Sequence, residues 1–454
     1  MRTPGDILFE PLRFRNLTVK NRIFRSNISG RFDNYDGSGS YARLNWEERF
    51  ARGGVGAIIS SFVPVSISGR IMPNYATIDA DNKIPFWREV ARRVHAYDCR
   101  YILQLSHCGR QQDIPGVENQ FRKPLSSTGN IESFNGFVCQ MMSREDIRRT
   151  IQDFGQGARR AREAGLDGVE THSANGYLFT QFLSPGINNR RDEYGGSLEN
   201  RARFLREVVV EVRNQVGSDF HFQVKINGAD YGNAVFPWEH KGNTIQDTIQ
   251  VCRWLEQDGV DAIHVSGGSS FPHPFNPPGG FPIDWALRTF DTMLSSGAFA
   301  FQRYLFFRYR PLRPLFNFFW NRNKPKIVEG INVENARQIK AQVSIPVLVT
   351  GGFQTASYIR TVITEGCCDA VSIARGLVAN PDLVKIFESG KNLPDRPCTH
   401  CNKCLVNALK NPVGCYELSR FDGDYDRMIQ EVMSVFHPSP FDPLEVGAHG
   451  LTGY

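Results

Sequence analysis

Two near-repeats, Glu-Ala-Gly-Leu-Asp-Gly-Val-Glu at 163–170 and Gln-Asp-Gly-Val-Asp-Ala-Ile-His at 257–264, decide the fold of this chain. In each, a glycine ends an amphipathic helical stretch and an aspartate opens a short strand. The same order of strand, loop and helix recurs along the chain. It predicts eight strands, at 22–27, 55–60, 101–105, 168–171, 221–226, 262–265, 346–350 and 370–373.

Helical stretches between these strands indicate that the strands run parallel, because each parallel crossover needs a helix. The clearest are predicted at 144–164, 198–216, 244–258, 333–343 and 355–365. Eight strands close a TIM barrel, and an open, doubly wound sheet is the alternative. We therefore expect an α/β protein with a (β/α)8 TIM barrel over 1–390. A long insertion at 269–326 would follow the sixth strand, and a short cysteine-containing extension would occupy 391–454.

The composition excludes several classes of protein. A net charge of +6, from 53 basic and 47 acidic residues, is too mild and dispersed to indicate nucleic-acid binding. The first residues lack the apolar core of a signal peptide, and no apolar run is long enough for a membrane span. The 10 cysteines are then not expected to form a disulfide scaffold, and we expect a reducing, cytoplasmic setting.

Glycines and an arginine follow the last two predicted strands. Gly351 and Gly352 come after strand seven, and Arg375 after strand eight. Loops at these positions of a barrel commonly bind phosphate, where glycine allows close backbone approach and arginine supplies charge. The alternative is an ordinary turn and a surface charge. The pairing of both features favours a phosphate site.

Three polar side chains lie just beyond strand four: His172, Asn175 and Tyr177. The histidine and asparagine could donate two hydrogen bonds to one carbonyl oxygen, which would polarise an enone and stabilise the developing enolate. Tyr177 could donate the proton to the neighbouring carbon. Each residue alone could instead be packing in a polar turn, but the three together favour catalysis.

Here the sequence resembles a known family. HSANGYLFTQFLSP at 172–185, followed by NNRRDEYGGSLENRARF at 188–204, is similar to the signature of Old Yellow Enzyme-like flavoproteins. More narrowly, it resembles the NADH:flavin oxidoreductase and 2,4-dienoyl-CoA reductase branch. The resemblance runs from LFEPLRFRN at 8–16 to the cysteines near 415.

The resemblance implies FMN at the carboxyl end of the barrel and NAD(P)H as electron donor. Gln104 matches the residue that contacts the flavin pyrimidine, and Lys225 a basic residue near flavin N1 and O2, where many members have arginine. His273 is the nearest match to a proton-relay histidine after strand six. The matching cofactor positions are Ser26, Asn27, Ile28, Ser29, Ser61, Gln104, Lys225, Gly351, Gly352, Ala374 and Arg375.

Four cysteines, Cys398, Cys401, Cys404 and Cys415, have the spacing C-x2-C-x2-C-x10-C. Compact thiolates of this kind suit zinc or an iron–sulfur cluster. In relatives resembling trimethylamine dehydrogenase and dienoyl-CoA reductase, a similar group holds a [4Fe-4S] cluster. We favour the cluster over zinc or free thiols, although no Gly-x-Gly-x-x-Gly follows to provide an internal electron partner.

The predicted insertion at 269–326 begins rich in glycine and proline and ends in interleaved aromatic and basic residues, with no acidic residue between Asp291 and Glu329. It could be a lid over a hydrophobic substrate. Its 296–326 part could alternatively contact a membrane surface or another subunit of a homo-oligomer. It could also pack on the barrel flank, and we favour packing or a subunit contact.

The function that we favour is hydride transfer from NAD(P)H through FMN to an activated alkene, such as an α,β-unsaturated carbonyl. The alternative is an amine dehydrogenase, similar to trimethylamine dehydrogenase, that passes electrons out through a cluster. A third hypothesis is a lyase of the aldolase type, in which Lys225 would form a Schiff base.

Overall fold

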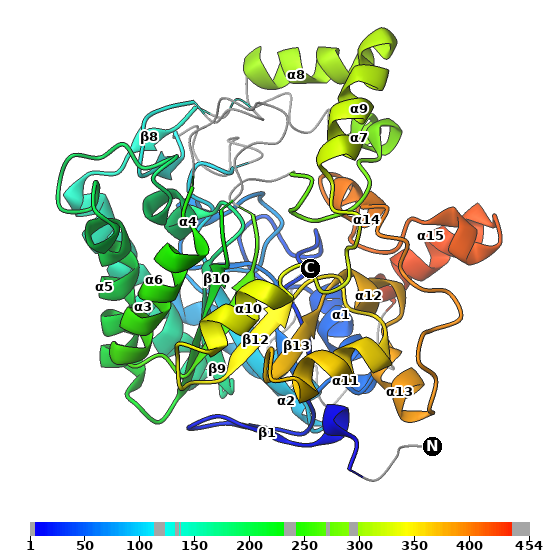
Figure 1. Cartoon of the computed structure of the whole chain (residues 1–454), viewed down its shortest axis with the longest axis horizontal. Coiled ribbons are helices and arrows are strands. Elements are labelled where there is room, and N and C mark those ends of the chain that lie inside the picture. The colour runs from blue at the N-terminus through cyan, green and yellow to red at the C-terminus, as the bar shows by residue number, and fades with distance from the viewer. Residues whose placement is uncertain are drawn as a thin grey trace.

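Eight parallel strands close into a barrel in the computed structural model, which describes residues 5–112, 123–131, 136, 138–230, 242–268, 273–289 and 298–437 (Figure 1). Each strand pairs with the next, and the last pairs with the first, so the sheet closes. The prediction of a TIM barrel is confirmed, and the alternative of an open, doubly wound sheet is wrong. The strands are β3 (Ile23–Arg25), β4 (Ala57–Ile59), β6 (Arg100–Ser106), β9 (Gly168–Ser173), β10 (His221–Asn227), β11 (Ala262–Ser266), β12 (Val347–Thr350) and β13 (Ala370–Ile373).

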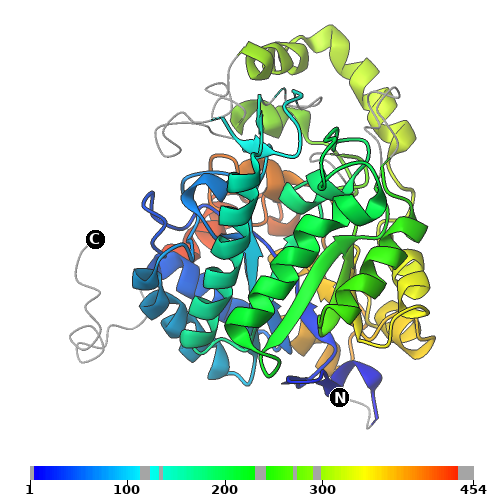
Figure 2. The same ribbon diagram turned by 90° about the vertical axis from the view of Figure 1, so that its left-hand side faces the viewer.

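Helices coat the outside of this barrel, with α3 and α5 packed along one flank (Figure 2). The prediction for 198–216 matches its helix to the residue, and Ser197 caps it by accepting a hydrogen bond from the Asn200 N–H at 3.3 Å. The helices are α1 (Tyr41–Arg52), α2 (Ile84–His95), α3 (Arg144–Glu163), α4 (Leu178–Leu183), α5 (Leu198–Val216), α6 (Ile245–Gln257), α10 (Val333–Lys340), α11 (Ala356–Thr364), α12 (Arg375–Ala379) and α13 (Leu383–Glu388).

The aspartate of each near-repeat ties its strand to the preceding strand in the barrel. The Asp261 carboxylate accepts from the Phe222 N–H at 2.9 Å, while its own N–H donates to the Phe222 carbonyl at 2.8 Å. Asp167 makes the same pair of bonds with Tyr101, and Asp369 a similar pair with Val347. The aspartate therefore fixes the register of neighbouring strands and satisfies backbone groups where pairing begins.

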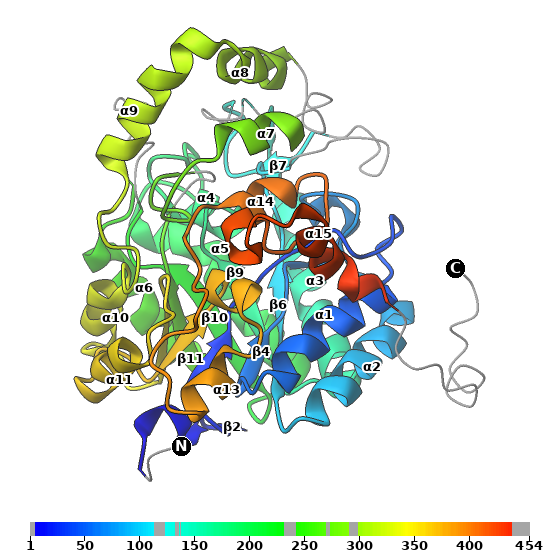
Figure 3. The ribbon, with the colours of Figure 1, turned by 90° about the vertical axis from the view of Figure 1, so that its right-hand side faces the viewer.

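The amino-terminal end of the barrel is closed by apolar packing. A hairpin of β1 (Leu12–Arg13) and β2 (Thr18–Val19) lies across this end, below the strands in Figure 3. Its side chains form one buried cluster with the first inward-facing residue of several strands, including Ala57, Ile102 and Leu348. This end is therefore a packed core, and the chemistry of a TIM barrel is expected at the opposite, carboxyl end.

The strands alternate, so that every second residue points inward. The inward residues of β9 include Glu170 and His172, and those of β10 include Gln223 and Lys225. The register places Lys225 beside His172 and Gln223 beside Glu170. The barrel thus has an apolar layer below, a buried polar layer in the middle, and catalytic candidates at its carboxyl end.

The remaining elements surround that carboxyl end. Three helices, α7 (Ile283–Thr289), α8 (Ala298–Arg308) and α9 (Arg313–Asn323), lie in the predicted insertion, and α14 (Lys403–Asn407) and α15 (Tyr425–Met433) in the predicted extension (Figures 1 and 3). Short strands β5 (Val63–Pro64), β7 (Leu125–Ser126) and β8 (Gln140–Met141) complete the fold. No helix in the described ranges has both the length and the hydropathy of a membrane span.

Candidate active site

A pocket opens at the carboxyl end of the barrel, where the strands deliver their last inward side chains. It brings together most of the predicted residues, while Ile28, Ser29, Ser61 and Gln104 lie outside its lining. The predicted residues that line it are Ser26, Asn27, His172, Asn175, Tyr177, Lys225, Gly351, Gly352, Ala374 and Arg375. These positions come from five strand ends and are up to 349 residues apart in sequence, yet they share one cavity.

His172 presents a hydrogen-bond donor to this pocket. Burial, with the positive charge of Lys225 nearby, holds the pKa of its imidazole well below the usual value, so the ring is neutral near pH 7. Its Nδ1 accepts from the Ala174 N–H at 3.4 Å, which assigns the proton to Nε2. Nε2 is buried and has no hydrogen-bond partner among the described residues. A buried, unsatisfied donor of this kind indicates a missing ligand.

Asn175 is hydrogen-bonded within the protein through its side chain. Its backbone is left-handed, with φ of 60°, and its side-chain Nδ2 donates to the Gly267 carbonyl at 2.8 Å and to Asn276 Oδ1 at 3.1 Å. Both amide hydrogens therefore have acceptors in this structure. Asn175 secures the loop after β11, and it could donate to a substrate carbonyl only by exchanging one of these bonds.

Tyr177 stands beside His172 at the pocket wall. Its ring centroid is 4.9 Å from that of His172 and 4.8 Å from that of Phe62. The position suits a proton donor to an atom next to the one that His172 would bind. Phe62, which the sequence analysis did not identify, fixes the orientation of both rings.

Lys225 supplies a buried cation on the same face. Burial lowers the pKa of its ammonium group to about 8, while the carboxylate of Glu170 raises it. Its Nζ donates to Asn27 Oδ1, which joins the ends of β10 and β3. A cation here would stabilise negative charge that develops on a bound group.

A polar layer lies beneath these residues and centres on Glu170. This carboxylate, fully buried, accepts from Gln104 Nε2 at 2.7 Å and Gln223 Nε2 at 2.5 Å, and it contacts His264 Nδ1 at 2.7 Å. Ser372 Oγ lies 2.6 Å from the other nitrogen of His264. The Gln104 amide is thereby oriented, and its Oε1 is buried with no partner among the described residues.

The sequence analysis did not identify Glu170 as functional. The available signal was its position two residues before His172, which places both on the inward face of β9. A carboxylate in a fully buried strand requires compensating donors. Such donors could have been sought on the neighbouring strands.

The predicted phosphate loops meet at one side of the pocket. Gly352 has φ of +73°, and a Cβ there would lie 2.8 Å from the Val328 side chain and carbonyl, so glycine is required. The Arg375 guanidinium donates to the Pro278 carbonyl at 2.7 Å and to Asn402 Oδ1. Arg375 therefore joins the pocket, the loop after β11 and the cysteine segment, rather than pointing freely into solvent.

The loop after β11 covers part of the pocket through residues 275–278, which the sequence analysis did not assign to the site. His273 lies at its base but not in the pocket lining, and its Nδ1 accepts from the Phe275 N–H at 3.1 Å. Its suggested relay role has no support from this position. The first four residues of the predicted insertion, 269–272, lie outside the described part of the chain.

The four cysteines lie close enough together to influence one another. Burial raises the pKa of the Cys398 thiol, and Cys415 and Cys401 raise it further, while Arg375 lowers it. The pKa of Cys404 is raised by burial and then by Cys398. No three His, Cys, Asp or Glu side chains of the described ranges are placed as a metal site would require.

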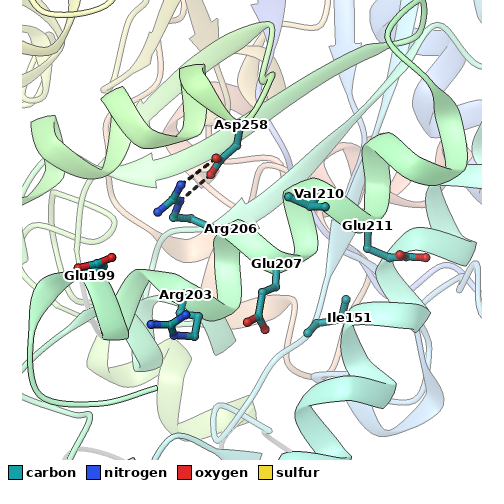
Figure 4. Close-up of a pocket in the computed structure, with 8 residues that line it drawn as sticks. All are labelled: Ile151, Glu199, Arg203, Arg206, Glu207, Val210, Glu211 and Asp258. Carbon is teal, nitrogen blue, oxygen red and sulfur yellow. Dashed lines mark hydrogen bonds and ion pairs between the residues drawn. The ribbon is translucent and has the colours of Figure 1, made fainter. Parts of the chain in front are cut away.

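A second hollow lies on the barrel flank beside α3 and α5 (Figure 4). One ion pair closes part of it, because Arg206 donates to both oxygens of Asp258 at 2.7 and 2.9 Å. Glu207 accepts from the Tyr194 hydroxyl at 3.0 Å. None of the predicted site residues lines it, so we place the chemistry at the barrel mouth.

Comparison with known proteins agrees with this geometry. A family model described as the NADH:flavin oxidoreductase / NADH oxidase family matches residues 7–274, more than half of the chain. The chain belongs to this family. Residues 321–430 also match a model described as dihydrouridine synthase, which covers the last two barrel strands and the cysteines.

Two curated relatives illustrate the extent of the match. NADPH dehydrogenase of Halalkalibacterium halodurans is 35% identical over 268 residues, or 59% of this chain and 75% of the relative. NADH oxidase of Thermoanaerobacter brockii is 29% identical over 424 residues, or 90% of this chain and 57% of the relative. The chain thus spans little more than half the length of that relative.

Solved structures share the fold of this chain. A complex of 2-naphthoyl-CoA reductase with 2-naphthoyl-CoA has a TM-score of 0.73 at 22% identity, covering 92% of this chain and 58% of that one. An Old Yellow Enzyme homologue from Zymomonas mobilis has a TM-score of 0.64 at 22% identity, covering 86% and 94%. At these identities the likeness supports the fold alone.

Proposed function

We propose that this protein binds FMN at the barrel mouth and reduces an activated alkene with NADH or NADPH. The observation that carries the proposal is the neutral Nε2–H of His172, which has no partner among the described residues and belongs to a ring that lines the pocket with the buried cation of Lys225. Curated relatives named NADPH dehydrogenase and cinnamate reductase support the same class of reaction.

The residues present suit FMN. The unsatisfied Oε1 of Gln104 could accept from a flavin N–H, and Lys225 could hold a flavin carbonyl. The Gly351–Gly352 turn lines the pocket together with Arg375, where a phosphate could bind. Bound FMN would accept hydride from NAD(P)H and deliver it to the β-carbon of the alkene.

The chain's own residues would then control the acceptor. His172 Nε2–H donates to the substrate carbonyl and stabilises the negative charge that develops on its oxygen. The ring needs no protonation for this, since its low pKa keeps it neutral. Tyr177 supplies a proton to the α-carbon, so that alkene, NAD(P)H and one proton become alkane and NAD(P)+.

The direct test is anaerobic. Protein carrying FMN is reduced with one equivalent of NADPH or NADH and then mixed with 2-cyclohexenone, and in a separate reaction the oxidised protein is mixed with trimethylamine. Recovery of the oxidised flavin spectrum and formation of cyclohexanone support ene reduction. Flavin reduction by trimethylamine, with no reaction of the enone, would instead support the amine dehydrogenase alternative, to which a relative named N,N-dimethylglycine/sarcosine dehydrogenase is similar.

We also propose that Cys398, Cys401, Cys404 and Cys415 bind a [4Fe-4S] cluster. Their compact spacing and mutual influence on pKa support this, and four thiolates are the usual ligand set. The described cysteine side chains are not arranged around one metal position, and the alkene reduction proposed above does not require them. Iron and sulfide analysis tests the assignment, and zinc or metal-free thiols are the contrary outcomes.

A further inference from the structure

Helices α8 and α9 form a hairpin that stands out from the barrel at its carboxyl end (Figures 1 and 3). One face of the hairpin is buried. Phe307 of α8 and Phe316 and Trp320 of α9 pack with Ile283 and Phe281 in a separate apolar cluster. Trp320 Nε1 also donates to the Gly279 carbonyl at 3.0 Å, which fixes α9 to the loop after β11.

The opposite face of the hairpin exposes large apolar side chains that have no role in this packing. Phe301 and Leu305 are one helical turn apart on α8 and are 49% and 46% exposed, and Phe318 on α9 is 57% exposed. We call this set the apolar hairpin surface; its members are Phe301, Leu305, Tyr309, Leu315, Phe318 and Phe319. So many exposed aromatic residues in one short segment mark an interaction site.

The charge of the same segment identifies the partner. Residues 298–328 contain seven basic residues and no acidic residue: Arg303, Arg308, Arg310, Arg313, Arg322, Lys324 and Lys326. Arg313 is paired with Asp284 at 2.8 Å, whereas Arg308, Arg310 and Arg322 are exposed beside the apolar side chains. Aromatic rings flanked by arginines are typical of helices that lie in the interface of an anionic membrane.

We propose that the apolar hairpin surface docks this protein peripherally on anionic lipid. A second copy of the hairpin fits less well, because its equally basic surface would be repelled. A bilayer accepts protruding side chains without a matching groove, and its phosphates complement the arginines. The hairpin stands at the same end as the pocket, so docking would turn the pocket mouth towards the lipid.

The test is flotation of the full-length protein with vesicles of phosphatidylcholine alone, or of phosphatidylcholine with phosphatidylglycerol. Binding to the mixed vesicles is expected, with little binding to the neutral ones and a loss at high ionic strength. Arg308→Gln and Arg322→Gln should each lower the partition coefficient about fivefold.

Phe318→Ser combined with Phe319→Ser should abolish flotation without changing the thermal unfolding midpoint, since both side chains are exposed. Val210→Ser, at a side chain 49% exposed on α5, is the matched control and should float like the wild type. Absence of flotation with anionic vesicles would overturn the proposal. The proposal would also be overturned if the Phe318/Phe319 variant bound the vesicles as well as the wild type does. It would be overturned, too, if the sole effect of that variant were loss of a dimer in light scattering.

Discussion

Replacing Glu170 with glutamine tests the polar layer that supports the pocket. The carboxylate has three contacts at hydrogen-bond distance, from Gln104, Gln223 and His264. An amide keeps one oxygen and brings two hydrogens of its own, so at least one of these donors must face another donor. A buried polar group left without a partner costs about 1–3 kcal/mol, and loss of a buried charge in a network costs more.

We therefore expect Glu170→Gln to lower the free energy of unfolding by about 2–4 kcal/mol. A second effect should appear in cofactor binding. If the Gln104 amide turns to satisfy the new side chain, its Oε1 is no longer available to accept from a flavin N–H. FMN affinity should then fall about tenfold, corresponding to roughly one hydrogen bond.

Urea unfolding followed by circular dichroism gives the first quantity, and quenching of FMN fluorescence gives the second. Glu207→Gln is the matched control, because this half-buried carboxylate accepts one hydrogen bond, from Tyr194, that an amide oxygen could also accept. Its loss of stability should stay within about 0.5 kcal/mol. Wild-type stability and FMN affinity in Glu170→Gln would refute the role assigned to the polar layer.

Three further perturbations address the strands and the site. Lys225→Met removes an ammonium group whose pKa is about 8 in the folded protein and 10.5 ordinarily. Between these pH values the unfolded chain binds one proton more than the folded chain, so the stability of the wild type relative to this variant should rise from pH 8 to pH 10.5, by at most about 3 kcal/mol. Urea titrations measure this difference, and a fall would contradict the assignment. In stopped flow, His172→Ala should slow the reoxidation of reduced flavin by an enone about 100-fold or more, while the affinity for FMN stays nearly unchanged. An equal loss of the reoxidation rate with an oxidant that has no carbonyl group would argue against carbonyl binding by His172. Asp261→Ala removes the buried acceptor of the Phe222 N–H and should destabilise the protein by about 2–4 kcal/mol in the same urea assay. A loss of less than about 0.5 kcal/mol would contradict the role of Asp261 in joining the two strands.

The repeating strand pattern is predictable because its cause is local. In both near-repeats the glycine adopts a positive φ after the helix, and the aspartate carboxylate binds the backbone of the strand beside it. The place of His172, Lys225 and Arg375 in one pocket follows from the rule that parallel strands end at the same face. These relations need only the strand positions.

What the sequence could not predict depends on contacts between distant segments. The engagement of the Asn175 amide by Asn276 joins residues 101 apart, and the link from Arg375 to Pro278 joins residues 97 apart. Both involve the loop after β11, whose path has no periodic signal. The apolar hairpin surface was likewise ambiguous, because composition does not tell which aromatic rings pack inward until the helices are placed.

The most direct test of the account is the visible spectrum of the purified protein under anaerobic conditions, before and after NADH or NADPH, with bound FMN quantified after release. We expect about one FMN per chain and bleaching of its absorption by the reduced nicotinamide. A colourless protein that takes up no added FMN would contradict the assignment of the barrel-mouth pocket.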